Sequence, residues 1–144
     1  PYGIYANNLI DTELATWFRD AYVDRFGTLP TQGSYQYAQG ILGAKYAYEK
    51  AAAANGGKFP STDQVIAALE GATFQGIATE VRLALNNGHQ GLTDHMWGIS
   101  KYDPDTGLPV VTDVVLYKAE CVMPPDGVGS VEWIKGGMKG AQCD

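Results

Sequence analysis

Apolar and polar residues follow a helical period through the first half of the chain. The longest such stretch runs from Gly33 to Asn55, where apolar residues recur at steps of four and three and therefore share one helix face. Those residues are Tyr37, Ile41, Ala44, Tyr48 and Ala51. Alanine, the strongest helix former, dominates the second half, and Asn55-Gly56-Gly57 supplies a stop. The pattern predicts a long helix over residues 33–55.

Two glycines lie inside this long stretch. Gly40 and Gly43 each cost about 1 kcal/mol relative to alanine in a helix interior. Glycines kept at such positions indicate that another backbone packs closely against the same turn. We therefore expect a close backbone neighbour at this part of the helix.

A shorter helix is predicted before the long one. Asp11 or Thr12 can cap its start, and Gly27 ends it, since glycine accepts the left-handed conformation of a helix stop. Its apolar face has helical spacing and consists of Leu14, Trp17, Phe18, Ala21 and Phe26. We expect Trp17 and Phe18 to lie in the core.

The period changes after a third helix, which begins at a capping box formed by Ser61 and Gln64. Residues 77–85 alternate between apolar and polar, which predicts a half-buried strand. Two more strands are predicted over residues 95–100 and 110–117, with turn-forming sequences between the strands. The expected fold class is therefore α/β, with three helices followed by about three strands.

These elements make an incomplete domain. Three strands are too few to cover the apolar faces of three helices. The opening segment Pro1-Tyr2-Gly3-Ile4-Tyr5 also looks strand-like and has no obvious neighbour. We expect the missing surface to come from another stretch of polypeptide.

Composition narrows the classes of function. The chain has 144 residues, of which 45% are hydrophobic, as in a globular protein rather than a disordered one. Its formal net charge of −6 disfavours nucleic acid and anionic membranes as partners, because both need a basic surface. No run approaches 18 consecutive apolar residues, so no membrane-spanning helix is predicted.

The two cysteines, Cys121 and Cys143, both lie in the last quarter of the chain. The segment between them is rich in glycine and proline and has little periodic structure. On the loop-entropy model, a disulfide that closes this segment would stabilise the folded chain by about 3 kcal/mol. It would also imply an oxidising compartment. The alternative is that they are two unrelated thiols.

Few residues form a recognisable catalytic or metal-binding set. His89 follows a turn and His95 begins a predicted strand, where its neighbour Asp94 would point to the opposite face. No serine-nucleophile, zinc, thiol-redox or phosphate-loop motif is present. The acidic turn at residues 103–107 lacks the rest of a calcium loop. The sequence therefore favours neither catalysis nor a metal site.

Aromatic residues at the ends of predicted elements are candidates for ligand contact, because pockets form there in α/β folds. Tyr35 and Tyr37 lie at the start of the long helix, near its unpaired N–H groups and the positive end of its dipole. Tyr2 and Tyr5 lie near the two ends of the opening segment. The competing interpretation is that such tyrosines are core residues with satisfied hydroxyls.

The order of several short motifs resembles a known family. F-x-x-x-Y-x-x-x-F-G-x-x-P spans residues 18–30 and leads into a helix rich in tyrosine and alanine that ends in E-K-A. A-A-L-E-G, F-Q-G, an alternating strand and N-x-G-H-Q follow. Together they resemble the C-terminal part of type I periplasmic binding proteins, and more closely the branched-chain amino-acid and amide receptors of ABC transporters. The resemblance covers residues 1–117.

This resemblance implies a fold. Members of the family have two α/β lobes joined by crossing strands, with a ligand trapped between the lobes, and two such lobes need roughly 200–300 residues. The chain would be the C-terminal part of this type I periplasmic-binding-protein fold, incomplete without the N-terminal chain. Residues 1–117 would complete one lobe and cross over, and residues 118–144 would form an irregular tail that the cysteine pair could staple.

The resemblance also implies a role. The protein would be the substrate-binding component of an ABC transporter, not an enzyme, and would need no cofactor. Its partners would be a small solute such as an amino acid, amide or small carboxylate, a membrane permease, and the N-terminal part of the same protein, which would hold the main ligand-gripping residues. Its place would be the periplasm, or the outer surface of the cell as a lipoprotein.

In many members an aromatic residue at the start of the long helix lines the cleft. Here that residue is Tyr35 or Tyr37, because Tyr37-Ala38-Gln39 replaces the usual Y-D-A motif and leaves the register open. Tyr2 and Tyr5, near the crossing, are weaker candidates.

Three alternatives stay open. The same fold could serve as a regulatory ligand sensor or a receptor ectodomain. A small hydrolase could use His89 or His95 with Asp94 or Asp113. The chain could also be a self-sufficient structural or interaction domain. That would require strands within the chain to cover the apolar faces of its helices.

Overall fold

Helices precede strands along the chain. The computed structural model describes residues 10–77, 79–84, 90–105 and 107–140. The first three helices are α1 (Glu13–Phe26), α2 (Gln32–Ala54) and α3 (Thr62–Leu69). The strands of the described residues are β1 (Thr73–Gln75), β2 (Glu80–Ala84), β3 (Gln90–Leu92), β4 (His95–Asp103) and β5 (Leu108–Tyr117). Two short helices follow, α5 (Ala119–Val122) and α6 (Ser130–Lys135). The α/β class is thus confirmed.

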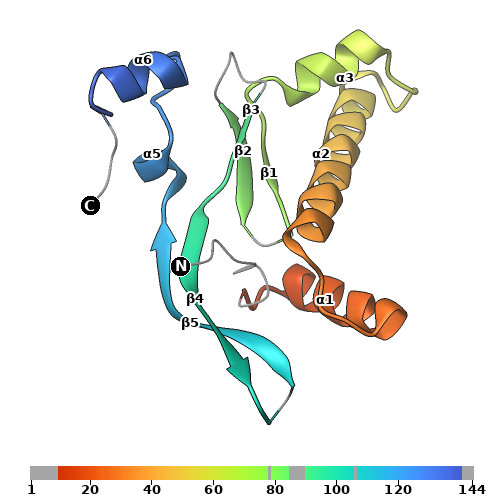
Figure 1. The fold of residues 1–144 in the computed structure, drawn as a ribbon. Coiled ribbons are helices and arrows are strands. Elements are labelled where there is room, and N and C mark those ends of the chain that lie inside the picture. The colour runs from red at the N-terminus through yellow and green to blue at the C-terminus, as the bar shows by residue number, and fades with distance from the viewer. Residues whose placement is uncertain (1–9, 78, 85–89, 106, 141–144) are drawn as a thin grey trace.

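The strands form two antiparallel sheets. One has the order β1-β2-β3 and the other pairs β4 with β5. Figure 1 shows α2 standing beside the three-stranded sheet, with α1 across its lower end and α3 across its upper end. The β4–β5 ribbon runs on the other side of that sheet and extends below it (Figure 1). A two-stranded ribbon of this kind needs a further covering layer to be stable.

The helix starts agree with their sequence signals. Thr12 caps α1 by accepting a hydrogen bond from the backbone N–H of Ala15 at 3.1 Å. Gly27 ends α1 in the left-handed conformation at φ 68°. At α3, the side chains of Ser61 and Gln64 each bond the other residue's backbone N–H, which is the predicted capping box. These contacts join residues three positions apart, so the sequence specifies them locally.

The strand predicted over residues 77–85 is wrong in its first part. The chain forms β1 earlier, at Thr73–Gln75, and then turns, with the N–H of Gly76 donating to the carbonyl of Thr79 at 3.0 Å. β2 begins at Glu80 and pairs back onto β1. A side chain at residue 76 would lie 2.6 Å from that carbonyl oxygen, so the turn requires glycine there.

The buried face of α2 differs from the predicted face. Of the predicted face only Ala51 is buried, together with Tyr35, Gly43 and Ala47, whereas Tyr37, Ile41 and Tyr48 are 82%, 70% and 45% exposed. The reason is contact with β1, because the ring of Phe74 occupies the space above Gly43. A Cβ atom there would lie 2.9 Å from Phe74 Cζ. The close neighbour is therefore an aromatic ring and not a backbone, and Gly40 has open space around it.

The main core lies where α1, α2 and the β1–β2 turn meet. Ala15, Tyr35 and Ile77 are almost fully buried there, and partly buried residues pack around them. Those residues are Ile10, Phe18, Ala38 and Leu42. Phe18 thus belongs to the core as expected, but Trp17 does not, since it is 63% exposed. Trp17 lies one position from the face of α1 that meets α2.

A bulge interrupts the β4–β5 ribbon. Trp97 pairs with Val115, but Ile99 pairs with Thr112, so two residues of β5 oppose Gly98 alone. One of them, Asp113, has the positive φ of 52°. A side chain at residue 98 would collide with Val111 and with the carbonyl oxygen of Thr112. The bulge adds twist and a bend to the ribbon at this point.

Candidate functional site

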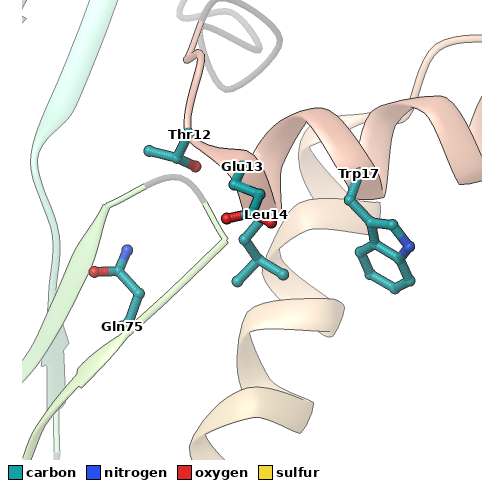
Figure 2. Close-up of a pocket in the computed structure, with 5 residues that line it drawn as sticks. All are labelled: Thr12, Glu13, Leu14, Trp17 and Gln75. Carbon is teal, nitrogen blue, oxygen red and sulfur yellow. The ribbon is translucent and has the colours of Figure 1, made fainter.

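An open pocket lies between the start of α1 and strand β1. Figure 2 shows its lining residues, with Glu13 and Leu14 at the start of α1 toward the strand that carries Gln75 and Trp17 further along the helix. The pocket measures about 680 Å³, within the range of small-ligand sites. It is lined by Thr12, Glu13, Leu14, Trp17 and Gln75.

Local hydrogen bonds at the cap fix the shape of this pocket. The Thr12 hydroxyl donates to the carbonyl oxygen of Ile77 at 3.2 Å while accepting from the N–H of Ala15. This residue therefore ties the helix start to the β1–β2 turn. Glu13 occupies the first turn of α1, where a carboxylate is favoured by the helix dipole.

The pocket combines two kinds of surface. Leu14 and Trp17 supply apolar walls, and the Glu13 carboxylate and Gln75 carboxamide supply polar groups. Such a lining can pack an apolar group and hydrogen-bond an amine or amide. The sequence analysis did not single out Glu13 or Gln75, because the two residues are far apart in sequence and no motif links them.

The structure describes two of the four tyrosines proposed as ligand contacts. Tyr35 is 1% exposed and packs against Phe18, with ring centroids 5.1 Å apart, inside the main core. Tyr37 is 82% exposed at the start of α2. Tyr2 and Tyr5 lie outside the described residues. Of the two candidate tyrosines at the start of α2, only Tyr37 presents its ring to solvent.

Burial changes the ionisation of Tyr35. It raises the pKa of the phenol above the ordinary value of 10.0, and the positive charge of Arg19 lowers that pKa by a smaller amount. The unfolded chain therefore releases this proton at a lower pH than the folded chain does. Its stability contribution is complete below about pH 10 and is lost as pH rises through the folded pKa.

We expect the Tyr35→Phe variant to lose less stability than the wild type when the pH is raised from about 8 to about 11. Phenylalanine keeps the ring in the core and has no proton to release. Urea midpoints of both proteins at the two pH values measure the difference, and lysines and other tyrosines affect both proteins alike. Equal losses in the two proteins would contradict the assignment.

A second, smaller pocket is polar. It measures about 390 Å³, lies between β2 and the start of α5, and is lined partly by Asp94, Lys118 and Arg82. The Lys118 ammonium donates to Asp94 at 2.7 Å, and this hydrogen bond raises the pKa of Lys118. Asp94 also accepts the N–H of Ala119 at 3.1 Å. Both of its oxygens are therefore engaged in holding α5.

Arg82 links the same region to the tail. Its guanidinium lies 3.3 Å from Glu120 and 3.3 Å from Asp126. Both carboxylates form ion pairs with the guanidinium, and these pairs connect β2 to the segments around α5. These ion pairs are partly exposed, so they position the segments more than they stabilise them.

The histidines form no catalytic set in the described part of the chain. His89 lies outside it. His95 begins β4, and its Nε2 atom is buried without a hydrogen-bond partner. Asp94 is engaged with Lys118, and Asp113 lies on the bulge of β5, 3.9 Å from Lys101. The described residues also contain no group of three potential metal ligands.

The predicted pairing of the cysteines remains a prediction. Cys121 lies in α5, and no free cysteine occurs among the described residues. Cys143 lies outside them.

In the part of the chain that the structure covers, no helix is both long enough and apolar enough to cross a bilayer.

The described chain combines helices with short antiparallel strands, and comparison with solved structures identifies its fold. An ABC-type branched-chain amino acid transporter from Rhodopseudomonas palustris CGA009 matches with a TM-score of 0.66 and 22% identity. An ABC transporter substrate-binding protein from Sphaerobacter thermophilus matches with a TM-score of 0.54 and 22% identity.

The matches cover most of this chain and a minor part of the others. They span 81% and 78% of this chain but 29% and 30% of the two solved chains. The chain therefore has part of the type I periplasmic-binding-protein fold, as the sequence resemblance predicted. No protein-family model matches the sequence, and no curated protein is similar enough to match.

Proposed function

We propose that this protein is the substrate-binding component of an ABC transporter and that it binds a small solute between two lobes. The single observation that supports this most is the likeness in fold to the Rhodopseudomonas palustris protein, at a TM-score of 0.66 over 81% of this chain. The solute would be an amino acid, an amide or a small carboxylate. The role is non-enzymatic and needs no cofactor.

The mechanism would be closure of two lobes around the solute, after which a membrane permease recognises the closed form. Residues 1–117 would contribute helices to one lobe and then cross over, and residues 118–144 would form the tail. An N-terminal part of the same protein would complete the lobes and hold the main ligand contacts. The site of action would be the periplasm.

Tyr37 is the aromatic contact that this proposal favours. It lies at the start of α2 with 82% of its surface exposed, so its ring is available to a solute. Tyr35 is buried in the core, where its ring packs against Phe18. Tyr2 and Tyr5 remain secondary candidates.

Solute binding by the full-length gene product tests the proposal. Calorimetric titrations with L-leucine, acetamide and succinate sample an apolar amino acid, an amide and a small carboxylate. We expect one of these classes to bind in the micromolar range or tighter. The Tyr37→Ala variant should bind that solute about two- to tenfold more weakly, because it loses an aromatic contact worth about 0.5–1.5 kcal/mol.

Tyr102→Ala is the matched control, since Tyr102 is also a strongly exposed tyrosine, at 71%, but lies on β4. This variant should bind as the wild type does. Failure of all three solute classes, in a protein that is folded by circular dichroism, would contradict the solute-binding role. If both substitutions weakened solute binding equally, Tyr37 would not be a contact of the solute site.

A further inference from the structure

The pocket between α1 and β1 has no part in the proposed function, although it is the larger of the two pockets described above. Its volume of about 680 Å³ is sufficient for a small organic ligand. Tyr37, the tyrosine assigned to the solute, is not among the described residues that line it. The chemistry of the lining therefore has to be considered separately from the solute site.

The helix geometry of α1 brings an acidic and an aromatic side chain together in this pocket. At 100° per residue, Glu13 and Trp17 lie about 40° apart around the helix and one turn from each other. Both side chains are exposed, Trp17 by 63%. Figure 2 shows Leu14 beside Glu13, toward the strand that carries Gln75. One side of the helix therefore offers the pocket a carboxylate, an indole ring and an aliphatic side chain.

The charge of the Glu13 carboxylate is not neutralised by the described residues. Asp11 and Asp20 both pair with Arg19, whereas Glu13 takes part in no ion pair in the described part of the chain. No lysine or arginine occurs among the described lining residues. The helix end supplies only about half a unit of positive charge, and the formal net charge of the protein is −6. The pocket is therefore negative and attracts a cation.

The other polar groups of the lining have hydrogen-bond donors that are already engaged. The Thr12 hydroxyl donates to the carbonyl oxygen of Ile77. The Nε2 atom of Gln75 donates to the carbonyl oxygen of Gly76 at 2.9 Å. Because a carbonyl oxygen can only accept, this bond fixes which end of the carboxamide is the nitrogen and leaves Oε1 as an acceptor. The lining therefore suits a ligand that donates several hydrogen bonds.

We propose that this pocket binds a small organic ammonium ion, an amine with an apolar body and no carboxylate of its own. The ammonium group would donate to the Glu13 carboxylate and to Gln75, and the apolar body would pack on Leu14 and Trp17. An ammonium group close to the indole face also gains from the negative face of the ring. The site is additional to the solute site of the proposed function and does not rest on it.

The charge of the lining also defines which ligands are excluded. A carboxylate in the ligand would be repelled by Glu13 and would meet no cation among the described lining residues. An uncharged amide or alcohol would lose the attraction between the two charges. An amino acid should therefore bind this pocket less tightly than the amine that lacks its carboxylate.

Titration of the isotope-labelled full-length protein with phenethylamine, followed by NMR near neutral pH, tests the site. The indole N–H signal of Trp17, assigned through the Trp17→Phe variant, reports on the pocket. We expect this signal to shift saturably while those of Trp97 and Trp133, which are not among the described lining residues, stay in place. Phenethyl alcohol, which replaces the ammonium by a hydroxyl, and L-phenylalanine, which adds a carboxylate, should each bind at least about fivefold more weakly.

A pair of variants separates the Glu13 carboxylate from the overall charge of the protein. Glu13→Gln keeps the length of the side chain and should weaken phenethylamine binding at least about fivefold. Asp63→Asn is the matched control, because Asp63 is also an exposed acidic residue in the first turn of a helix, α3. This variant should bind as the wild type does, and circular dichroism verifies that both variants are folded.

Three results would overturn the proposal. The first is an unchanged Trp17 signal on addition of phenethylamine. The second is equal or tighter binding of the alcohol or of L-phenylalanine. The third is the same affinity for Glu13→Gln and Asp63→Asn, because the carboxylate of Glu13 would then have no specific part. Since phenethylamine is not among the solutes titrated above, loss of solute binding leaves this result unchanged.

Discussion

Replacing Ile77 with alanine is expected to lower the free energy of unfolding by about 2–5 kcal/mol. Ile77 is 2% exposed and forms the main core with Ala15 and Tyr35. It therefore joins the β1–β2 turn to α1 and α2, and its truncation leaves a cavity between three elements. Urea unfolding of the 144-residue chain, followed by circular dichroism, measures the loss.

Ile41→Ala is the matched control. It removes the same atoms from a side chain that is 70% exposed, so its effect should stay within about 0.5 kcal/mol. A loss of similar size for both variants would show that the core is not centred on the β1–β2 turn. A negligible loss for Ile77→Ala would show the same.

Breaking the proposed link between Cys121 and Cys143 is expected to lower the free energy of unfolding by about 3 kcal/mol. The disulfide would close a loop that contains α6 and would reduce the number of conformations open to the unfolded tail. Cys121 lies in α5, two residues after Ala119, and Ala119 forms a small buried cluster with Leu92 of β3. The link would therefore anchor the tail to a part of the chain that is packed on β3.

Three variants separate a disulfide from two independent thiols. Cys121→Ser, Cys143→Ser and the double variant should all lose the same stability, because each removes the same bond. The wild-type mass should rise by about 2 Da on reduction, as two hydrogens are added. Losses that add in the double variant, or an unchanged mass, would exclude the bond.

The sequence predicted the features of the fold that depend on near neighbours. The caps at Thr12 and Ser61 and the stop at Gly27 each join residues three or four positions apart, and all three are present. The change from helical to alternating period was also visible. Strand β1 and the turn after it were missed, because the turn is closed by Gly76 and Thr79 without a common turn dipeptide.

The sequence could not decide which side of α2 is buried. Both sides carry apolar residues, so periodicity alone cannot rank them. The choice depends on Phe74, which lies 31 positions from Gly43 and stacks with Tyr46 at a ring separation of 5.8 Å. The stronger helical stripe was therefore predicted as the core face, although all of it except Ala51 is exposed.

The candidate site was predicted only in part. Tyr37 could be proposed from its place at a helix start, and its exposure in the structure fits that proposal. The pocket at Glu13 and Gln75 could not be predicted, because it arises where Thr12 bonds the carbonyl of Ile77, 65 positions away. Contacts over such distances leave no local pattern in the sequence.

The bulge in the β4–β5 ribbon has a consequence for self-association. The segment Val110–Tyr117 is rich in valine and has high strand propensity, which is the composition of segments that stack into cross-β fibrils. Asp113 is its only charged residue, and the bulge holds that residue with its side chain 64% exposed. A charge and a bend at the centre of an edge strand both oppose stacking with another copy. The same residue that breaks the register of the ribbon therefore acts as a gatekeeper against aggregation.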